Sequence, residues 1–72
     1  MKSGIVKSYN EQSRYGFITV DGGYTNTEGF LARDIFFHDS GMTYRAEKGD
    51  NVTFRIEQGK KGLLAVEVKK IN

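Results

Sequence analysis

The chain has 72 residues and a formal net charge of +2, from 11 Lys and Arg against nine Asp and Glu. A chain of this length buries only about 60% of its unfolded surface on folding, which leaves no room for a deep catalytic cleft. It contains no cysteine, which excludes disulfides and thiolate metal sites, and its longest apolar run, residues 63–66, is too short for a membrane span. We therefore expect one domain over residues 1–72, monomeric and cytoplasmic, without enzymatic activity, metal or cofactor.

The first predicted strand, residues 4–9, places two β-branched residues, Ile5 and Val6, side by side. Strict alternation would send one of them to water unless a bulge or a twist turns the strand, as is common in small closed barrels. Lys7 follows and is free to face outward. Tyr9 either packs against the barrel or takes part in ligand contacts, and packing is the simpler interpretation.

The second predicted strand, residues 14–20, is apolar on both faces. Successive strand residues point to opposite faces, so Tyr15 and Phe17 share one face while Ile18 and Val20 share the other. β-Branched residues fit a pleated, half-buried surface, which makes the Ile18 face the better core candidate. Tyr15 and Phe17 are then exposed. Exposed rings beside a positive charge form a platform on which unpaired bases stack, at roughly 1–3 kcal/mol per base.

Two alternatives remain open for this strand. In a sheet that is covered on both faces, Tyr15 and Phe17 would simply belong to the core. Arg14, which supplies the positive charge next to the rings, is equally compatible with a solvated charge at a turn. The residues of this strand alone do not decide between these interpretations.

Residues 21–33 open with a strong turn signal, Asp-Gly-Gly, and continue with a stretch that is too apolar for a solvated loop. This stretch carries Tyr24, Phe30 and Leu31, and loops of this length are usually functional or disordered. Either Tyr24 and Phe30 fold over the face with the exposed rings, or Phe30 and Leu31 close one end of the barrel. In a third interpretation these residues are contacts for a protein partner.

The third predicted strand, residues 34–38, alternates in the same way, with Ile35 and Phe37 on one face and Phe36 and His38 on the other. Antiparallel pairing with the second strand would join the outward side chains into one aromatic patch. That predicted patch consists of Tyr15, Phe17, Phe36 and His38.

His38 is followed directly by Asp39, but this pair is a poor signal for catalysis or metal binding. Neighbouring strand residues point to opposite faces, and the chain offers no second His, no Cys and no obvious nucleophile to join them. A single imidazole does not make a metal site. We therefore interpret His38 as a stacking or hydrogen-bonding group.

Two predicted polar loops contain further candidate nucleic-acid contacts. In the loop after the third strand, Tyr44 and Arg45 form an aromatic and cationic pair that either reaches the patch or covers an end of the barrel. At the turn before the last strand, Lys60 and Lys61 are either phosphate contacts or part of an ordinary solvated turn.

The last two strands are predicted from simple alternation. One face of the fourth strand is formed by Val52, Phe54 and Ile56. One face of the fifth strand is formed by Leu64, Val66 and Val68.

Four stretches of the chain together resemble bacterial cold-shock proteins. They are Gly-Ile-Val-Lys at residues 4–7, Tyr-Gly-Phe-Ile-Thr at 15–19, Ile-Phe-Phe-His at 35–38 and Gly-Asp-Asn-Val-Thr-Phe at 49–54. The second and third stretches stand in the places of the first and second ribonucleoprotein motifs. The resemblance implies an all-β fold, a five-stranded antiparallel barrel of the OB type, that binds single-stranded RNA and DNA. It further implies a nucleic-acid chaperone or a regulator of transcription or translation.

The chain departs from the family pattern at several places. Ser8 stands where an exposed tryptophan is usual, and Asp39 where the family tends to have a further aromatic, so two stacking rings are missing. Arg14 replaces a glycine, and the loop at residues 21–33 is longer than usual. An alternative function is therefore a barrel whose ligand face has been lost and whose enlarged loop binds a protein.

From the residues and the resemblance together, we expect binding by base stacking, with cations in a supporting role because the net charge is small. The predicted nucleic-acid contacts are Lys7, Tyr9, Arg14, Tyr15, Phe17, Phe36, His38, Tyr44, Lys60 and Lys61.

Overall fold

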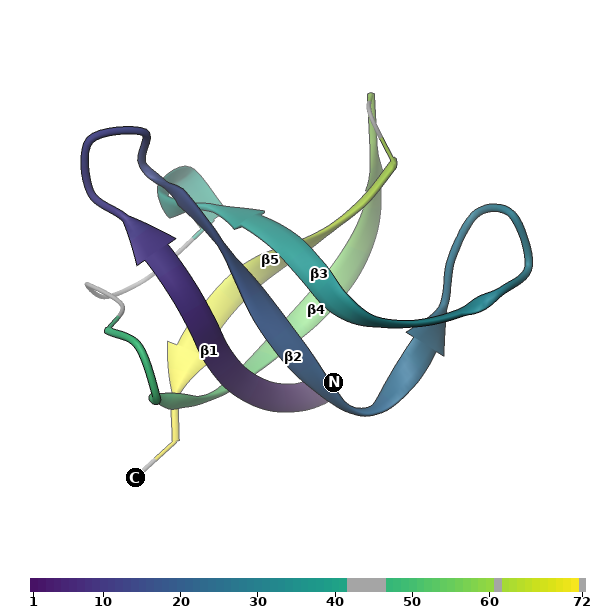
Figure 1. The fold of residues 1–72 in the computed structure, drawn as a ribbon, viewed down its shortest axis with the longest axis horizontal. Helices are drawn as coiled ribbons and strands as arrows, with labels where there is room; N and C mark the ends of the chain where they lie inside the picture. Colours follow the sequence, from purple (N-terminus) through teal and green to yellow (C-terminus); the bar gives the residue numbers. More distant parts are fainter. Residues whose placement is uncertain (42–46, 61, 72) are drawn as a thin grey trace.

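The computed structural model describes residues 1–41, 47–60 and 62–71 and shows a closed barrel of five strands in the order β1-β2-β3-β5-β4 (Figure 1). Neighbouring strands are antiparallel, apart from a short parallel contact between β3 and β5 that closes the barrel. This confirms the predicted all-β barrel of the OB type. Among the described residues, no helix is long and apolar enough to cross a membrane. The elements are β1 (Lys2–Asn10), β2 (Tyr15–Thr25), β3 (Leu31–His38), the 3-10 helix η1 (Asp39–Gly41), β4 (Asn51–Gly59) and β5 (Gly62–Lys70).

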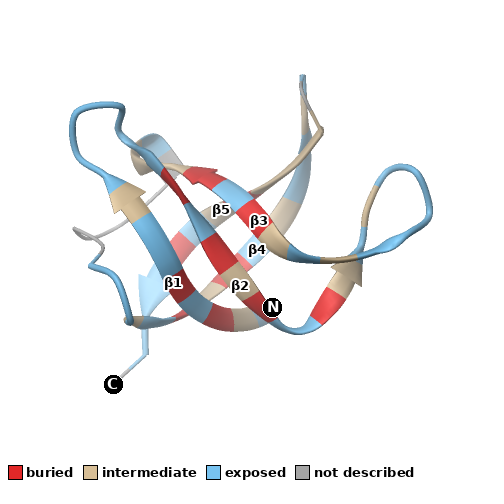
Figure 2. Ribbon diagram, in the orientation of Figure 1, coloured by how far each residue is buried: buried red, intermediate tan, exposed pale blue. Residues whose placement is uncertain are grey.

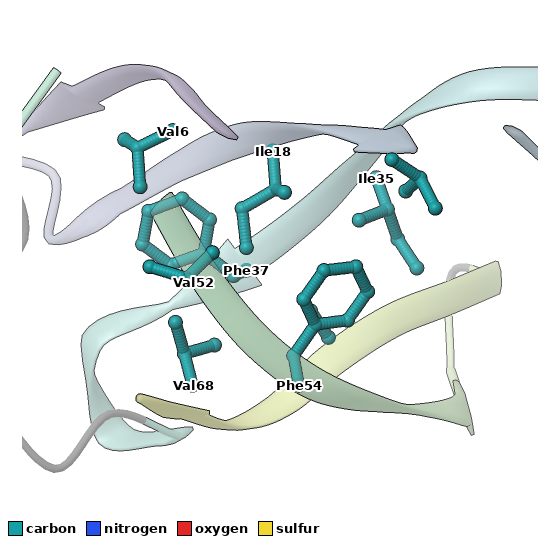
Figure 3. Close-up of a cluster of buried hydrophobic side chains, with 9 residues drawn as sticks. Val6, Ile18, Ile35, Phe37, Val52, Phe54 and Val68 are labelled. Atoms are coloured by element: carbon teal, nitrogen blue, oxygen red, sulfur yellow. The ribbon is translucent and has the colours of Figure 1, made fainter. Parts of the chain in front are cut away.

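The core lies inside the barrel and receives side chains from all five strands. Figure 2 shows buried and exposed stretches alternating along β1, β2 and β3, as period-two alternation requires. Figure 3 shows the largest of these side chains pointing toward one another between the strands. The buried hydrophobic residues are Val6, Ile18, Val20, Ile35, Phe37, Val52, Phe54, Ala65 and Val68.

The adjacent Ile5 and Val6 follow strict alternation in β1, and a bulge comes directly after them. The pairing of β1 with β2 shifts by one residue between Val6 and Ser8, so Lys7 is the extra residue. Val6 enters the core at 1% exposure, while Ile5 remains 44% exposed. A bulge is therefore present in β1, but it lies after these two residues and does not bring Ile5 into the core.

A second bulge, in β5, contradicts the alternation that the sequence predicted there. β5 pairs with β4 in a register that shifts between Thr53 and Arg55, and Glu67 on β5 adopts a left-handed backbone conformation with φ of 52°. The extra residue reverses the alternation, so Ala65 and Val68 are both buried. Leu64 therefore does not share the inner face with Val68.

Residues 21–33 form an extended hairpin in place of the predicted loop. β2 bends at Gly22 and Gly23, both with φ of 74°, a left-handed conformation that glycine adopts without steric cost. The strand then continues to Thr25, which pairs with Leu31. Figure 1 shows this hairpin, here called the β2–β3 arm (residues 21–33), extending beyond the barrel.

Both predictions that placed residues of this arm against the ligand face or an end of the barrel are wrong. Phe30 and Leu31 are 68% and 72% exposed, so they do not close an end of the barrel. Tyr24 is half-buried against the core, and its hydroxyl donates a 2.7 Å hydrogen bond to the backbone carbonyl of Asp34. Burial raises the pKa of the Tyr24 hydroxyl, and the charge of Asp34 adds to the effect. Tyr24 thus anchors the arm and does not cover the exposed rings.

Candidate nucleic-acid interface

Three aromatic rings, here called the aromatic patch, lie together on the outer face of β2 and β3. Tyr15 and Phe17 are each 39% exposed, and Phe36 is 36% exposed. The ring centroids are 5.5 Å apart for Tyr15 and Phe36, 6.1 Å for Phe17 and Phe36, and 6.5 Å for Tyr15 and Phe17. These separations are normal for interacting rings. The patch therefore presents a nearly continuous aromatic surface to solvent.

Strand alternation and register place these rings outside. Phe17 pairs directly with Phe36 across the antiparallel ladder, while Ile18 pairs with Ile35 on the inner face. Between Tyr15 and Phe17, Gly16 allows β1 to approach closely, because a Cβ there would collide with the Ser8 carbonyl oxygen. The core is filled without the three rings. The interpretation of Tyr15 and Phe17 as core residues is therefore wrong.

An open groove of about 800 Å³ runs between the aromatic patch and the β4–β5 hairpin. Tyr15, Phe17 and Phe36 line one side. The hairpin side is lined by Gly59, Lys60, Gly62, Leu63 and Leu64. The sequence predicted Lys60 here but missed the two leucines, because the bulge at Glu67 that turns Leu64 outward has no glycine to mark it.

His38 lies at the end of the patch, paired with Tyr15 across the ladder. Its Nδ1 accepts a 3.2 Å hydrogen bond from the Ser40 backbone N–H and lies 3.1 Å from the Ser40 hydroxyl oxygen. An Nδ1 that accepts this bond carries no proton, so in this arrangement Nε2 bears the hydrogen. Asp39 Oδ1 is 3.3 Å from the same nitrogen, a contact that attracts only a protonated ring.

Lys7 is turned toward Asp34 by the β1 bulge. Its Nζ lies 2.7 Å from Asp34 Oδ2, and the Thr19 hydroxyl donates a 3.0 Å hydrogen bond to Asp34 Oδ1. These two hydrogen bonds, from Lys7 and then Thr19, lower the pKa of Asp34. Lys7 is therefore present beside the predicted site, but its charge is already matched by a carboxylate.

Arg14 is held in the same manner at the other end of the patch. Its Nε donates a 2.7 Å hydrogen bond to Asp39 Oδ2, and this bond raises the pKa of the guanidinium. Its backbone adopts a left-handed conformation with φ of 63°, where glycine would be unstrained. Among the described residues, Lys60 is a groove-lining cation with no carboxylate partner.

The remaining predicted contacts are placed as follows. Tyr9 is half-buried and stacks on the buried Phe37 with a centroid separation of 5.8 Å, which matches its interpretation as a packing residue. Tyr44, Arg45 and Lys61 lie outside the described residues. Within the described part of the chain, no group of three or more His, Cys, Asp or Glu is placed to hold a metal.

The chain is similar to known proteins over nearly its whole length. The model of the family described as "'Cold-shock' DNA-binding domain" matches residues 2–71, which include all five strands. Cold shock-like protein CspG of Shewanella violacea is 39% identical over 70 residues, covering 92% of this chain and 89% of the relative. Cold shock protein ScoF of Streptomyces coelicolor is 41% identical over 66 residues, covering 86% and 87%. Cold shock protein CspB of Bacillus caldolyticus is 35% identical over 75 residues, covering 99% and 100%.

Proposed function

Because the chain belongs to the 'Cold-shock' DNA-binding domain family, we propose that it binds single-stranded RNA or DNA with low sequence specificity, as one monomeric domain. The observation that carries this proposal is the aromatic patch, three rings in mutual contact on the outer surface of a barrel whose core is complete without them. Every base has an apolar face, so stacking on these rings is tolerant of sequence. The bases of a duplex are already stacked on each other, so the patch selects unpaired strands.

Selective binding of unpaired strands gives the protein a chaperone role. A protein that binds the open form of a strand and not its folded form shifts the folding equilibrium of the nucleic acid by mass action. Weak hairpins in RNA are then melted without an energy source. Regulation of transcription or translation follows where such a hairpin controls either process.

We expect charge to contribute less than stacking to the free energy of binding. Lys7 and Arg14 border the patch, but Asp34 and Asp39 already neutralise them. Each phosphate that a cation contacts adds about −0.7 to the log-log salt slope for a single strand. We therefore expect a shallow salt dependence, with Lys60 as a phosphate contact.

Fluorescence anisotropy of a labelled oligothymidine tests the proposal, with the chain's own phenylalanines as matched variants. Loss of one stacking interaction, in Phe17→Ala or Phe36→Ala, is expected to weaken binding by about 5- to 150-fold. Phe30→Ala removes an equally large ring that is 68% exposed but lies on the β2–β3 arm, and it should bind normally. Equal affinity of all three variants and the wild type would refute stacking on the patch.

A second function is favoured by the β2–β3 arm, which exposes Phe30 and Leu31 side by side. Exposed aromatic and aliphatic side chains of this kind are common in protein interfaces. We propose that the arm contacts a protein partner. The test is a Phe30→Ser, Leu31→Ser double variant, which should lose a protein contact of the wild type while leaving oligothymidine binding unchanged. Loss of oligothymidine binding would instead assign the arm to the nucleic-acid site.

A further inference from the structure

Leu64 faces the groove beside Phe36 as a consequence of the β5 bulge. Leu63 packs against the core and Ala65 is buried, so Leu64, between them, points to the outer face. Across the parallel contact of β3 and β5, Leu64 is the direct partner of Phe36, and both line the groove. A base that stacks on Phe36 therefore has Leu64 at its edge.

The surroundings of Leu64 in the groove are apolar. An added Cβ at Gly59 would collide with Leu64 Cδ2, so the side chain lies directly against bare backbone of the hairpin. Glu57 pairs with Leu64 across the β4–β5 ladder, but its carboxylate is 3.2 Å from Arg55 Nη2 and it does not line the groove. The part of a base edge that contacts Leu64 thus meets methyl groups, although Lys60 lines the same groove.

An apolar edge discriminates between bases at their own apolar position. The C5 methyl group of thymine is the apolar feature that protein side chains contact on a base edge. Burying a polar base edge against Leu64 would leave that edge without a hydrogen-bond partner. We propose that Leu64 reads the C5 position of a pyrimidine stacked on Phe36 and favours a methyl group there. This inference rests on the proposed function and adds a modest preference to it.

A methyl scan of hexathymidine tests the inference. Each thymine is replaced in turn by deoxyuridine, which removes only the C5 methyl group and leaves the backbone and the pairing edge intact. At the base next to Leu64 we expect about two- to fourfold weaker binding, the effect of returning one methyl group to water. In a second strand that carries cytosine at that position, replacing the cytosine by 5-methylcytosine should strengthen binding by a similar factor.

Variants of Leu64 assign the effect to this side chain. Leu64→Asn keeps the approximate size but is polar, and it should abolish the difference between thymine and uracil at the sensitive position. Leu64→Met keeps an apolar side chain and should retain the difference. Val66→Asn is the matched control, because Val66 lies two residues further along β5 and does not line the groove. Circular dichroism and thermal melts of all variants, compared with those of the wild type, show whether they remain folded.

The outcomes separate this inference from the proposed function. Failure of the wild type to bind hexathymidine, or unchanged binding by both Phe17→Ala and Phe36→Ala, overturns both. Binding that depends on Phe36, together with a flat methyl scan, overturns only the role of Leu64. The role of Leu64 is likewise overturned if Leu64→Asn still binds the strand more tightly with thymine than with uracil at the sensitive position.

Discussion

The two carboxylates beside the aromatic patch should suppress the salt dependence of nucleic-acid binding. Lys7 Nζ lies 2.7 Å from Asp34 Oδ2, and Arg14 Nε lies 2.7 Å from Asp39 Oδ2. In an Asp34→Asn, Asp39→Asn double variant, neither cation keeps a carboxylate partner among the residues that the structure describes, so both become free to contact phosphates. The amide oxygen that Asp34→Asn introduces can still accept the hydrogen bond from the Thr19 hydroxyl, which preserves the local structure.

The magnitude follows from counting the released cations. Each new phosphate contact with a single strand adds about −0.7 to the slope of log affinity against log salt concentration, so two contacts add about −1.4. Between 200 mM and 50 mM salt, a slope difference of this size becomes an affinity gain of about sevenfold for the double variant relative to wild type. Each single variant should gain about 2.6-fold over the same range.

The assay is anisotropy of labelled oligothymidine at several salt concentrations. Asp21→Asn is the matched control, because it makes the same change in net charge as either single variant, at an exposed aspartate that accepts a hydrogen bond from the Ser3 hydroxyl. It should leave the slope near that of the wild type. An unchanged slope in the double variant, or a change in Asp21→Asn equal to that of the single variants, would refute the reasoning that these two ion pairs withhold the cations from the ligand.

Three further predictions concern stability. Gly16→Ala should destabilise the barrel by about 1–3 kcal/mol in chemical denaturation, because its Cβ collides with the Ser8 carbonyl; a neutral effect would contradict the close approach of β1 and β2. Tyr24→Phe removes the hydrogen bond to the Asp34 carbonyl and should cost about 1 kcal/mol while oligothymidine binding is retained; loss of binding would place Tyr24 in the site. The lowered pKa of Asp34 means that its ionised form stabilises the fold above the pKa of about 4 in the unfolded chain, and this contribution is lost as pH falls through the lower folded value. Acid denaturation should therefore show a smaller loss of stability below about pH 4 in Asp34→Asn than in wild type, and identical profiles would contradict the ion pair.

Local alternation in the two strands, taken together, predicted the rings of the aromatic patch. In β2 and β3, Phe17 and Phe36 each have a β-branched or aromatic neighbour that fills the core, so period-two alternation assigns these two rings to the surface and Ile18 and Ile35 to the interior. The pairing of the two strands then follows from placing both inner faces on the same core. The barrel itself followed from the resemblance, which spans motifs on several strands.

The features that sequence reasoning missed depend on contacts between distant residues or on unusual backbone conformations. Lys7 and Asp34 are 27 positions apart, so their ion pair appears only once the register of three strands is known. Leu64 was assigned to the wrong face because a left-handed Glu67 carries no glycine signal. At Gly22 and Gly23 the glycines predicted a turn that ends the strand, whereas the structure has a bend within a strand that continues to Thr25.

The short seam between β3 and β5 has a consequence for folding. β1, β2 and β3 are joined by local hairpin contacts, and so are β4 and β5, whereas the seam joins Phe36 with Leu64 and Phe37 with Ala65 across a long stretch of chain. The two halves are also joined by the pairing of β1 with β4, which is equally non-local. Contacts between distant residues are slow to form, so both connections, and with them the closed barrel, are expected to form after each half has folded. The groove spans this seam, with Phe36 on one half and Leu64 on the other. A bound single-stranded nucleic acid would therefore contact both halves at this seam and slow the opening of the barrel.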